Sequence, residues 1–319
     1  MKFRVLARSL GCAAAGMLAG AGFATAVSAA GDVNIYSYRQ PALIKPLLDE
    51  FTAQTGIRTR VIFAKKGLIE RIKAEGRNSP ADVLLTTDIG RLTGAVDAGV
   101  SQPVSSAVLE RQIPAAYRDS GGQWFGLTRR VRFILASKDR VAQNTITYEE
   151  LVDPKWRGRI CIRSGQHVYN VALLASMIAH HGEEKARTWL AGLKANLARK
   201  PSGNDRAQAK GVYSGECDLA IANTYYLGKM QTNEKKPEQK KWAAAIKPLF
   251  PNTGGRGSHV NLSGIVLAKH APNRENAIRL MEYLASDGAQ KIYASVNFEY
   301  PVESTGPFSC TRRPSTVQS

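Results

Sequence analysis

Short apolar runs alternate with runs of helical spacing between positions 33 and 85, and this alternation limits the fold more than any other feature of the sequence. Residues 33–38, 58–64 and 81–85 are predicted strands. Apolar side chains recur at helical spacing in 43–51 and 68–72, which predicts two intervening helices. Such a βαβαβ pattern is typical of an α/β fold with a parallel sheet covered by helices.

The carboxyl ends of these strands are expected to border a cleft, because parallel sheets bind their ligands there. The first strand is followed by Tyr38, Arg39 and Gln40, and the third by the polar residues 86–88. We therefore expect both segments to lie near a ligand.

A second series of strands and helices follows a connecting strand at 131–136. It includes strands at 159–163 and 217–222, and a later strand at 265–269 is expected to cross back. The roughly 290 residues after position 30 are too many for one compact core. We expect two lobes, the first formed by 31–131 with about 259–272, and the second by 132–258 with about 273–302.

Residues 1–30 have the three parts of a secretory signal peptide. Three basic residues lie within positions 2–8, an apolar Ala/Gly-rich stretch covers 10–23, and small residues at 27–29 offer a cleavage point. No later segment approaches the roughly 20 apolar residues that a membrane span needs. The sequence therefore predicts export into an oxidising compartment.

The formal net charge of +18 falls to +15 without the three basic residues of the predicted signal peptide. Such a charge favours nucleic acid, an anionic surface or an anionic ligand as partner. The basic residues are spread along the whole chain, and the dense run at 235–241 has a single aromatic neighbour, Trp242. We interpret that run as a solvated face and expect no nucleic-acid partner.

The exported chain contains Cys161, Cys217 and Cys310. We expect a disulfide between the first two, which is permitted outside the cytoplasm, and the alternative is a pair of buried free thiols. Cys161 and Cys217 lie eight residues before Tyr169 and Tyr225 respectively, so a bridge would bring the two tyrosine segments together.

Tyr169 and the adjacent pair Tyr225–Tyr226 are the candidate metal ligands. Three phenolate oxygens would offset the charge of a hard trivalent cation such as Fe(III) without histidine or cysteine. Among 11 tyrosines an adjacent pair also arises by chance in roughly one sequence in three, so the pair alone is weak evidence. Its position at the end of an apolar strand strengthens the hypothesis, because neighbouring side chains can share an ion only where a strand ends.

The chain resembles the periplasmic ferric-ion-binding proteins of bacterial ABC transporters from about Asn34 to Val302. The resemblance rests on the segments IYSYRQPALIKPLLDEF, SPADVLLTTDIGRL, QWFGLTRRVRFI, RSGQHVYN, GLKANLARKP and NTYYLGKM. It implies a two-lobed periplasmic binding protein of type II-like topology that closes by a hinge. It further implies that Tyr169, Tyr225 and Tyr226 bind Fe(III), and that a monomer delivers the ion to an inner-membrane permease with its ATPase.

The sequence departs from many members of that family in the first lobe. Gln40 and Pro41 stand where some members have histidine and tyrosine, and Thr87 stands near the position of a glutamate. It is similar to the branch in which three second-lobe tyrosines are the protein ligands, and an anion such as carbonate would complete the coordination. The candidate anion-binding residues are Arg130, Arg132 and Arg39, because guanidinium presents paired donors to planar oxyanions, together with Ser164 and Gly165.

Two other functions are weighed against iron binding. An enzyme would need a poised nucleophile and base, but no GxSxG or HExxH motif occurs, so we expect none. A periplasmic binder of a small oxyanion or a polyamine is the nearer alternative, because a fold does not choose its ligand. Residues 303–319 have no apolar period and form an atypical tail to which no function is given.

Overall fold

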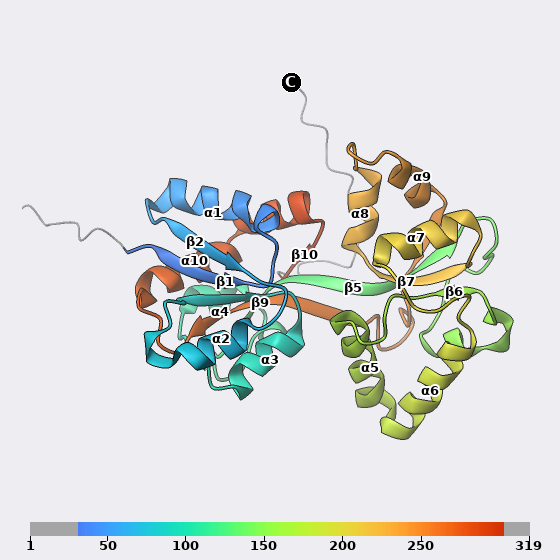
Figure 1. The fold of residues 1–319 in the computed structure, drawn as a ribbon, viewed down its shortest axis with the longest axis horizontal. Coiled ribbons are helices and arrows are strands. Elements are labelled where there is room, and N and C mark those ends of the chain that lie inside the picture. The colour runs from blue at the N-terminus through green and yellow to red at the C-terminus, as the bar shows by residue number, and fades with distance from the viewer. Residues whose placement is uncertain (1–30, 303–319) are drawn as a thin grey trace, which may run out of the picture. The chain divides into compact units, whose positions relative to one another are not determined.

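Three parallel strands begin the sheet, as the alternation in the sequence predicts. The computed structural model describes residues 31–302, in which β1 (Val33–Ser37) pairs with both β2 (Thr59–Phe63) and β3 (Val83–Thr86). Helices α1 (Pro41–Thr55) and α2 (Leu68–Glu75) connect these strands (Figure 1). The βαβαβ prediction is confirmed. The predicted signal peptide and the atypical tail lie outside the described residues.

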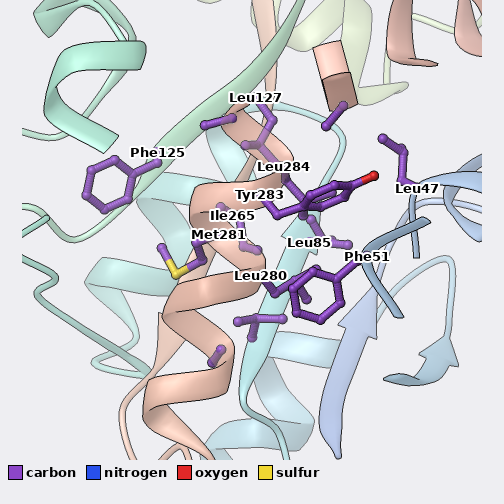
Figure 2. Packing of buried hydrophobic residues seen from close by; sticks show 14 of the residues in the cluster. Leu47, Phe51, Leu85, Phe125, Leu127, Ile265, Leu280, Met281, Tyr283 and Leu284 are labelled. Atoms are coloured by element: carbon purple, nitrogen blue, oxygen red, sulfur yellow. The ribbon is translucent and has the colours of Figure 1, made fainter. Parts of the chain in front are cut away.

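Helix α1 has residues suited to a helix at both of its ends and an apolar face along one side. Pro41 occupies the first turn, where a missing N–H costs nothing, and Gly56 ends the helix with a φ of 72°. Ile44, Leu47 and Phe51 are fully buried along one side. This face packs into the main hydrophobic cluster of the first lobe, part of which is shown in Figure 2.

Helix α10 (Arg274–Ala285) belongs to that same cluster. Leu280, Met281 and Leu284 of α10 share this cluster with Phe51 of α1, and Figure 2 shows Leu280 beside the Phe51 ring. The sequence predicts that residues from about 273 to 302 complete the second lobe, whereas α10 packs into the first-lobe cluster. The reason is that the strand before it, β9, returns to β3, and a helix that directly follows can only cover the sheet beside it.

Two long strands connect the lobes. β5 (Phe125–Ser137) is buried over its whole length, and its first half pairs antiparallel with β9 (Val260–Ala268). Its second half pairs with β7 (Leu219–Asn223) and β8 (Ile246–Leu249). The strand order is β2-β1-β3-β9-β5-β7-β6, so a single mixed sheet runs through both lobes.

The second lobe packs around the far half of β5. Its sheet ends in β6 (Ile160–Cys161), which is parallel to β7. Two hydrophobic clusters lie on the two faces of this sheet. Its larger helices are α5 (Val168–His181), α6 (Glu183–Ala195), α7 (Asp205–Ser214), α8 (Tyr225–Gln231) and α9 (Glu238–Ala244).

The remaining described elements are short. They are η1 (Gly76–Asn78), α3 (Ile89–Asp97), β4 (Ser101–Gln102), α4 (Ala107–Gln112), η2 (Ala115–Tyr117), η3 (Glu149–Val152), η4 (Pro154–Trp156), α11 (Asp287–Ile292), η5 (Tyr293–Asn297) and β10 (Tyr300–Pro301). Within residues 31–302, no helix is both long enough and apolar enough to cross a membrane.

Cys161 and Cys217 form a disulfide, so the predicted bridge is confirmed and the alternative of two free thiols is wrong. Cys161 ends β6, and Cys217 lies two residues before β7. The bridge therefore joins the two strands that lead to the tyrosine segments.

Candidate metal centre

The three candidate tyrosines lie at the starts of two helices in the second lobe. Tyr169 is the second residue of α5, where the ring of His167 accepts a hydrogen bond from the Tyr169 backbone N–H. Tyr225 and Tyr226 open α8, and Tyr225 lies two residues after Asn223, the last residue of β7. Strand β7 thus delivers the pair to the edge of the sheet, as predicted, and the chain turns into a helix rather than a loop.

The tyrosine side chains converge. The hydroxyl oxygens of Tyr169 and Tyr225 are 3.3 Å apart, although the two residues are 56 positions apart in the sequence. The rings of Tyr225 and Tyr226 stack with centroids 4.3 Å apart and an interplanar angle of 29°. Three phenol groups from two segments therefore face one location.

This location is a cavity of about 370 Å³ between the two lobes. Its wall is polar for the most part and contains four cationic side chains and one carboxylate. The lining residues are Tyr38, Arg39, Gln40, Leu43, Thr87, Arg130, Tyr169, Arg206, Tyr225, Tyr226, Lys229 and Glu299. Such a surface suits a small, highly charged ligand, with the positive side chains available to an anion that accompanies it.

Burial changes the acidity of the cavity groups. It raises the pKa of Tyr225 well above the ordinary value of 10, and the neighbouring Tyr169 and Tyr226 add to this rise. Burial also raises the pKa of Tyr226. The same cause lowers the pKa of Lys229 to about 8. Without a cation, the cavity therefore favours the neutral phenols of Tyr225 and Tyr226, and a bound metal ion would have to displace their protons.

Arg130 is the predicted anion-binding residue that the structure leaves available. It lines the cavity, is 1% exposed, and donates from Nη1 to Ser263 Oγ over 2.6 Å. Its Nε and Nη2 atoms are buried without a hydrogen-bond partner. Two adjacent donors on one edge of a guanidinium match the spacing of two oxygens in a carboxylate or carbonate.

Arg39 also lines the cavity, but its donors are occupied. They form a bidentate pair with Glu299 at 3.0 and 2.8 Å, and Nη2 also donates to Ser263 Oγ. Although burial opposes ionisation of Glu299, the Arg39 charge lowers its pKa to about 2. Arg39 therefore neutralises the buried carboxylate of Glu299 and has little capacity left to bind a second anion.

The other three predicted anion-binding residues lie elsewhere. Arg132 is fully buried outside the cavity lining, and its guanidinium is bound to Asp205 over 2.9 Å. Ser164 and Gly165 are exposed and do not line the cavity.

Three lining residues that sequence reasoning missed carry charge: Arg206, Lys229 and Glu299. Lys229 is four residues after Tyr225, a spacing that puts both on one face of a helix, so a helical reading of the pair would have found it. Arg206 and Glu299 depend on tertiary contacts and left no local signal.

The residues that replace the familiar first-lobe ligands lie where expected. Gln40 and Thr87 line the cavity, and neither offers an anionic oxygen. Among the residues that the structure describes, no group of three His, Cys, Asp or Glu side chains could hold a metal ion. Among the described residues, the three tyrosines therefore stay the candidate metal ligands.

Comparison with known proteins identifies the family of the chain. A family model described as bacterial extracellular solute-binding protein matches residues 78–313. Iron uptake protein A1 of Synechocystis sp. is 48% identical over 273 residues, which cover 85% of this chain and 76% of that protein.

Two solved structures share the fold. The apo ferric ion-binding protein A of Pasteurella haemolytica has a TM-score of 0.80 and 52% identity, covering 85% of each chain. The Trichodesmium protein FutA, solved with iron and citrate, has a TM-score of 0.82 and 46% identity, covering 88% of this chain and 89% of its own. The expected α/β periplasmic-binding-protein fold is thus confirmed.

Proposed function

Because the chain belongs to the bacterial extracellular solute-binding protein family, we propose that it captures Fe(III) in the periplasm for an inner-membrane ABC permease with its ATPase. The observation that carries this proposal is the convergence of Tyr169, Tyr225 and Tyr226 on one cavity. The relatives named for iron uptake and ferric ion binding support it. A cargo carrier of this kind acts as a monomer and catalyses no reaction.

The charge of the ligand set fits the proposed cargo. Three phenolates balance a trivalent cation, and oxygen anions are the ligands that hard cations prefer. Three protein ligands leave positions open on a six-coordinate ion. A bidentate anion such as carbonate would fill two of them, and its oxygens would accept hydrogen bonds from the free edge of Arg130.

The cationic wall bears on the alternative ligands. Arg39, Arg130, Arg206 and Lys229 outnumber the single carboxylate of Glu299, which disfavours a polyamine. A small oxyanion bound without metal remains compatible with the same wall. It is therefore the alternative that an experiment must separate from iron binding.

Titration of the metal-stripped mature protein with Fe(III), with and without bicarbonate, tests the proposal. We expect a tight 1:1 complex with a visible phenolate-to-iron charge-transfer band and tighter binding in bicarbonate. The double substitution Tyr225→Phe and Tyr226→Phe should abolish the band, and Tyr213→Phe, which alters an exposed tyrosine of α7, should leave it unchanged. Sulfate or phosphate binding without any uptake of iron would instead establish the oxyanion alternative.

A further inference from the structure

Asp205, the first residue of α7, is fully buried beneath the cavity and does not line it. Its Oδ1 accepts a hydrogen bond from Arg163 Nη1 over 2.9 Å. Its Oδ2 accepts from Arg132 Nη1 over 2.9 Å and from the backbone N–H of Asn223 over 2.7 Å. One carboxylate thus holds two guanidinium groups and the end of β7.

The same cluster reaches the segment of the first tyrosine through Asn170. Asn170 Oδ1 accepts from Arg132 Nη2 over 2.6 Å, and its Nδ2 donates to the backbone oxygen of Arg163 over 3.0 Å. Asn170 directly follows Tyr169, and Asn223 lies two residues before Tyr225. The hydrogen bonds of Asp205 and Asn170 therefore tie both ligand segments to one buried centre.

Arg163 joins this centre to the phenol groups themselves. Its guanidinium carbon lies 5.2 Å from the centroid of the Tyr169 ring, and its positive charge opposes the rise in the pKa of Tyr226 that burial causes. Arg163 is therefore positioned between Asp205 on one side and two candidate ligands on the other. A side chain with several rotatable bonds keeps such a position only if a partner fixes its far end.

We propose that Asp205 is a positioning residue for iron capture, because it fixes Arg163 against Tyr169 and Tyr226 and sets the spacing of the two ligand segments. This inference rests on the proposed function. Partners that orient metal ligands without touching the metal typically change affinity by about 10-fold to 100-fold. No local sequence pattern indicates this role, because an acidic residue in the first turn of a helix is common.

The substitution Asp205→Asn tests the contact with Arg163 selectively. The amide oxygen is expected to face the two donors at Oδ2, so the amide N–H₂ faces Arg163 and repels it. Arg163→Gln removes the same contact from the other side and leaves Arg132 with its carboxylate. Arg163→Gln therefore still tests the contact between Asp205 and Arg163 if Asp205→Asn does not fold.

Asp218 supplies a matched control. It lies immediately before β7, is nearly buried, and its carboxylate also bridges two arginines, Arg140 and Arg159. It lies at the other end of the strand from the tyrosine pair. Asp218→Asn thus repeats the loss of a two-arginine carboxylate in the same lobe without disturbing the proposed site.

The measurements are the position of the charge-transfer band and the rate of iron loss to EDTA. We expect Asp205→Asn and Arg163→Gln each to shift the band and to accelerate iron loss by about 10-fold to 100-fold. The double variant should be no worse than the single variants, because both remove one contact. Asp218→Asn should keep the wild-type band and rate.

Two results would overturn the inference. One is a wild-type band and rate in both Asp205→Asn and Arg163→Gln. The other is an equal change in Asp218→Asn, which would mean a general loss of stability. If the wild-type protein itself binds no Fe(III), the proposed function fails first and the positioning role falls with it.

Discussion

Arg130 and Arg132 lie two residues apart on β5 and therefore point to the same face of the strand, yet their partners differ. Arg132 is enclosed by Asp205 and Asn170, whereas Arg130 keeps two buried donors free at the cavity. A buried cation without acceptors is costly unless a ligand supplies them. The free edge of Arg130 is thus the residue-scale feature that supports the proposed anion beside the cargo.

Arg130→Lys tests this role, because lysine keeps the charge but cannot present two parallel donors. We expect Fe(III) affinity in bicarbonate to fall by about 10-fold to 100-fold, the value of one charge-assisted hydrogen bond. The loss should nearly vanish in carbonate-free buffer, as calorimetric titration in the two buffers would show. Arg129→Lys on the opposite face of β5 is the control. An equal loss of affinity in both buffers would contradict an anion-binding role.

Glu299 gives the metal-free protein a specific pH dependence. Burial opposes its ionisation, but Arg39 and Thr128 hold its pKa near 2, below the usual 4.5. A lowered folded-state pKa stabilises the fold above pH 4.5, and this contribution is lost as the pH falls from 4.5 toward 2. Its full size is on the order of 3 kcal/mol.

Urea unfolding of the wild type and of Glu299→Gln at several pH values from 7 to 3 measures that contribution. We expect the variant to be less stable at pH 7 and the two stabilities to approach each other in acid. The difference between the curves isolates Glu299 from other carboxylates. Curves that stay parallel over this range would show that the Arg39 pair does not control the acid response.

At the scale of elements, the disulfide links the end of β6 to the residues just before β7, and both strands lead to the segments of the candidate tyrosines. It closes a loop with a sequence separation of 56 residues, for which the chain-entropy model gives about 4 kcal/mol of stabilisation. We expect the double variant Cys161→Ala and Cys217→Ala to lose about 2–5 kcal/mol of unfolding free energy. Its iron complex should also dissociate faster, because the Tyr169 and Tyr225 segments are then joined only by non-covalent contacts.

Unfolding in urea with and without reductant checks this prediction. Reductant should bring the wild type to the stability of the double variant and should not change the variant further. A reductant effect of similar size in the variant would assign the loss to something other than this bridge.

Elements with a strong local pattern could be predicted, and contacts between distant segments could not. The strands of 33–85 follow from apolar runs bounded by polar residues, and β7 was found for the same reason. The role of Arg132 could not be predicted, because its ion-pair partner, Asp205, lies 73 residues away in the sequence. The apolar face of α10 likewise predicts a buried helix but not which of the two lobes it packs against. The tyrosines could be proposed early because residue type alone carries their chemistry.

For the whole molecule, the contact between α8 and the segment after η5 connects ligand binding to the first lobe. Gly228 is the fourth residue of α8, and a Cβ atom there would lie 2.5 Å from Phe298 Cδ1 and 2.9 Å from Cγ. Phe298 has a φ of 58°, an uncommon conformation for a non-glycine residue. The next residue, Glu299, pairs with Arg39 of the first lobe. A close approach at Gly228 thus sets the distance between the tyrosine helix and the first-lobe wall of the cavity.

Gly228→Ala should push α8 away from the segment at Phe298, because the new Cβ atom would clash with Cγ and Cδ1 of the Phe298 ring. These atoms lie close to the Phe298 backbone and cannot move aside easily. Overpacking of this kind costs about 1–3 kcal/mol. If the cavity must be narrow to hold the ion and its anion together, the cost appears as weaker Fe(III) binding in bicarbonate. Adding Phe298→Ala to Gly228→Ala should restore affinity, since the obstructing ring is then gone. Calorimetric titration of both single variants and the double variant decides the matter: a double variant as weak as Gly228→Ala alone would mean that the Phe298 contact does not control the cavity.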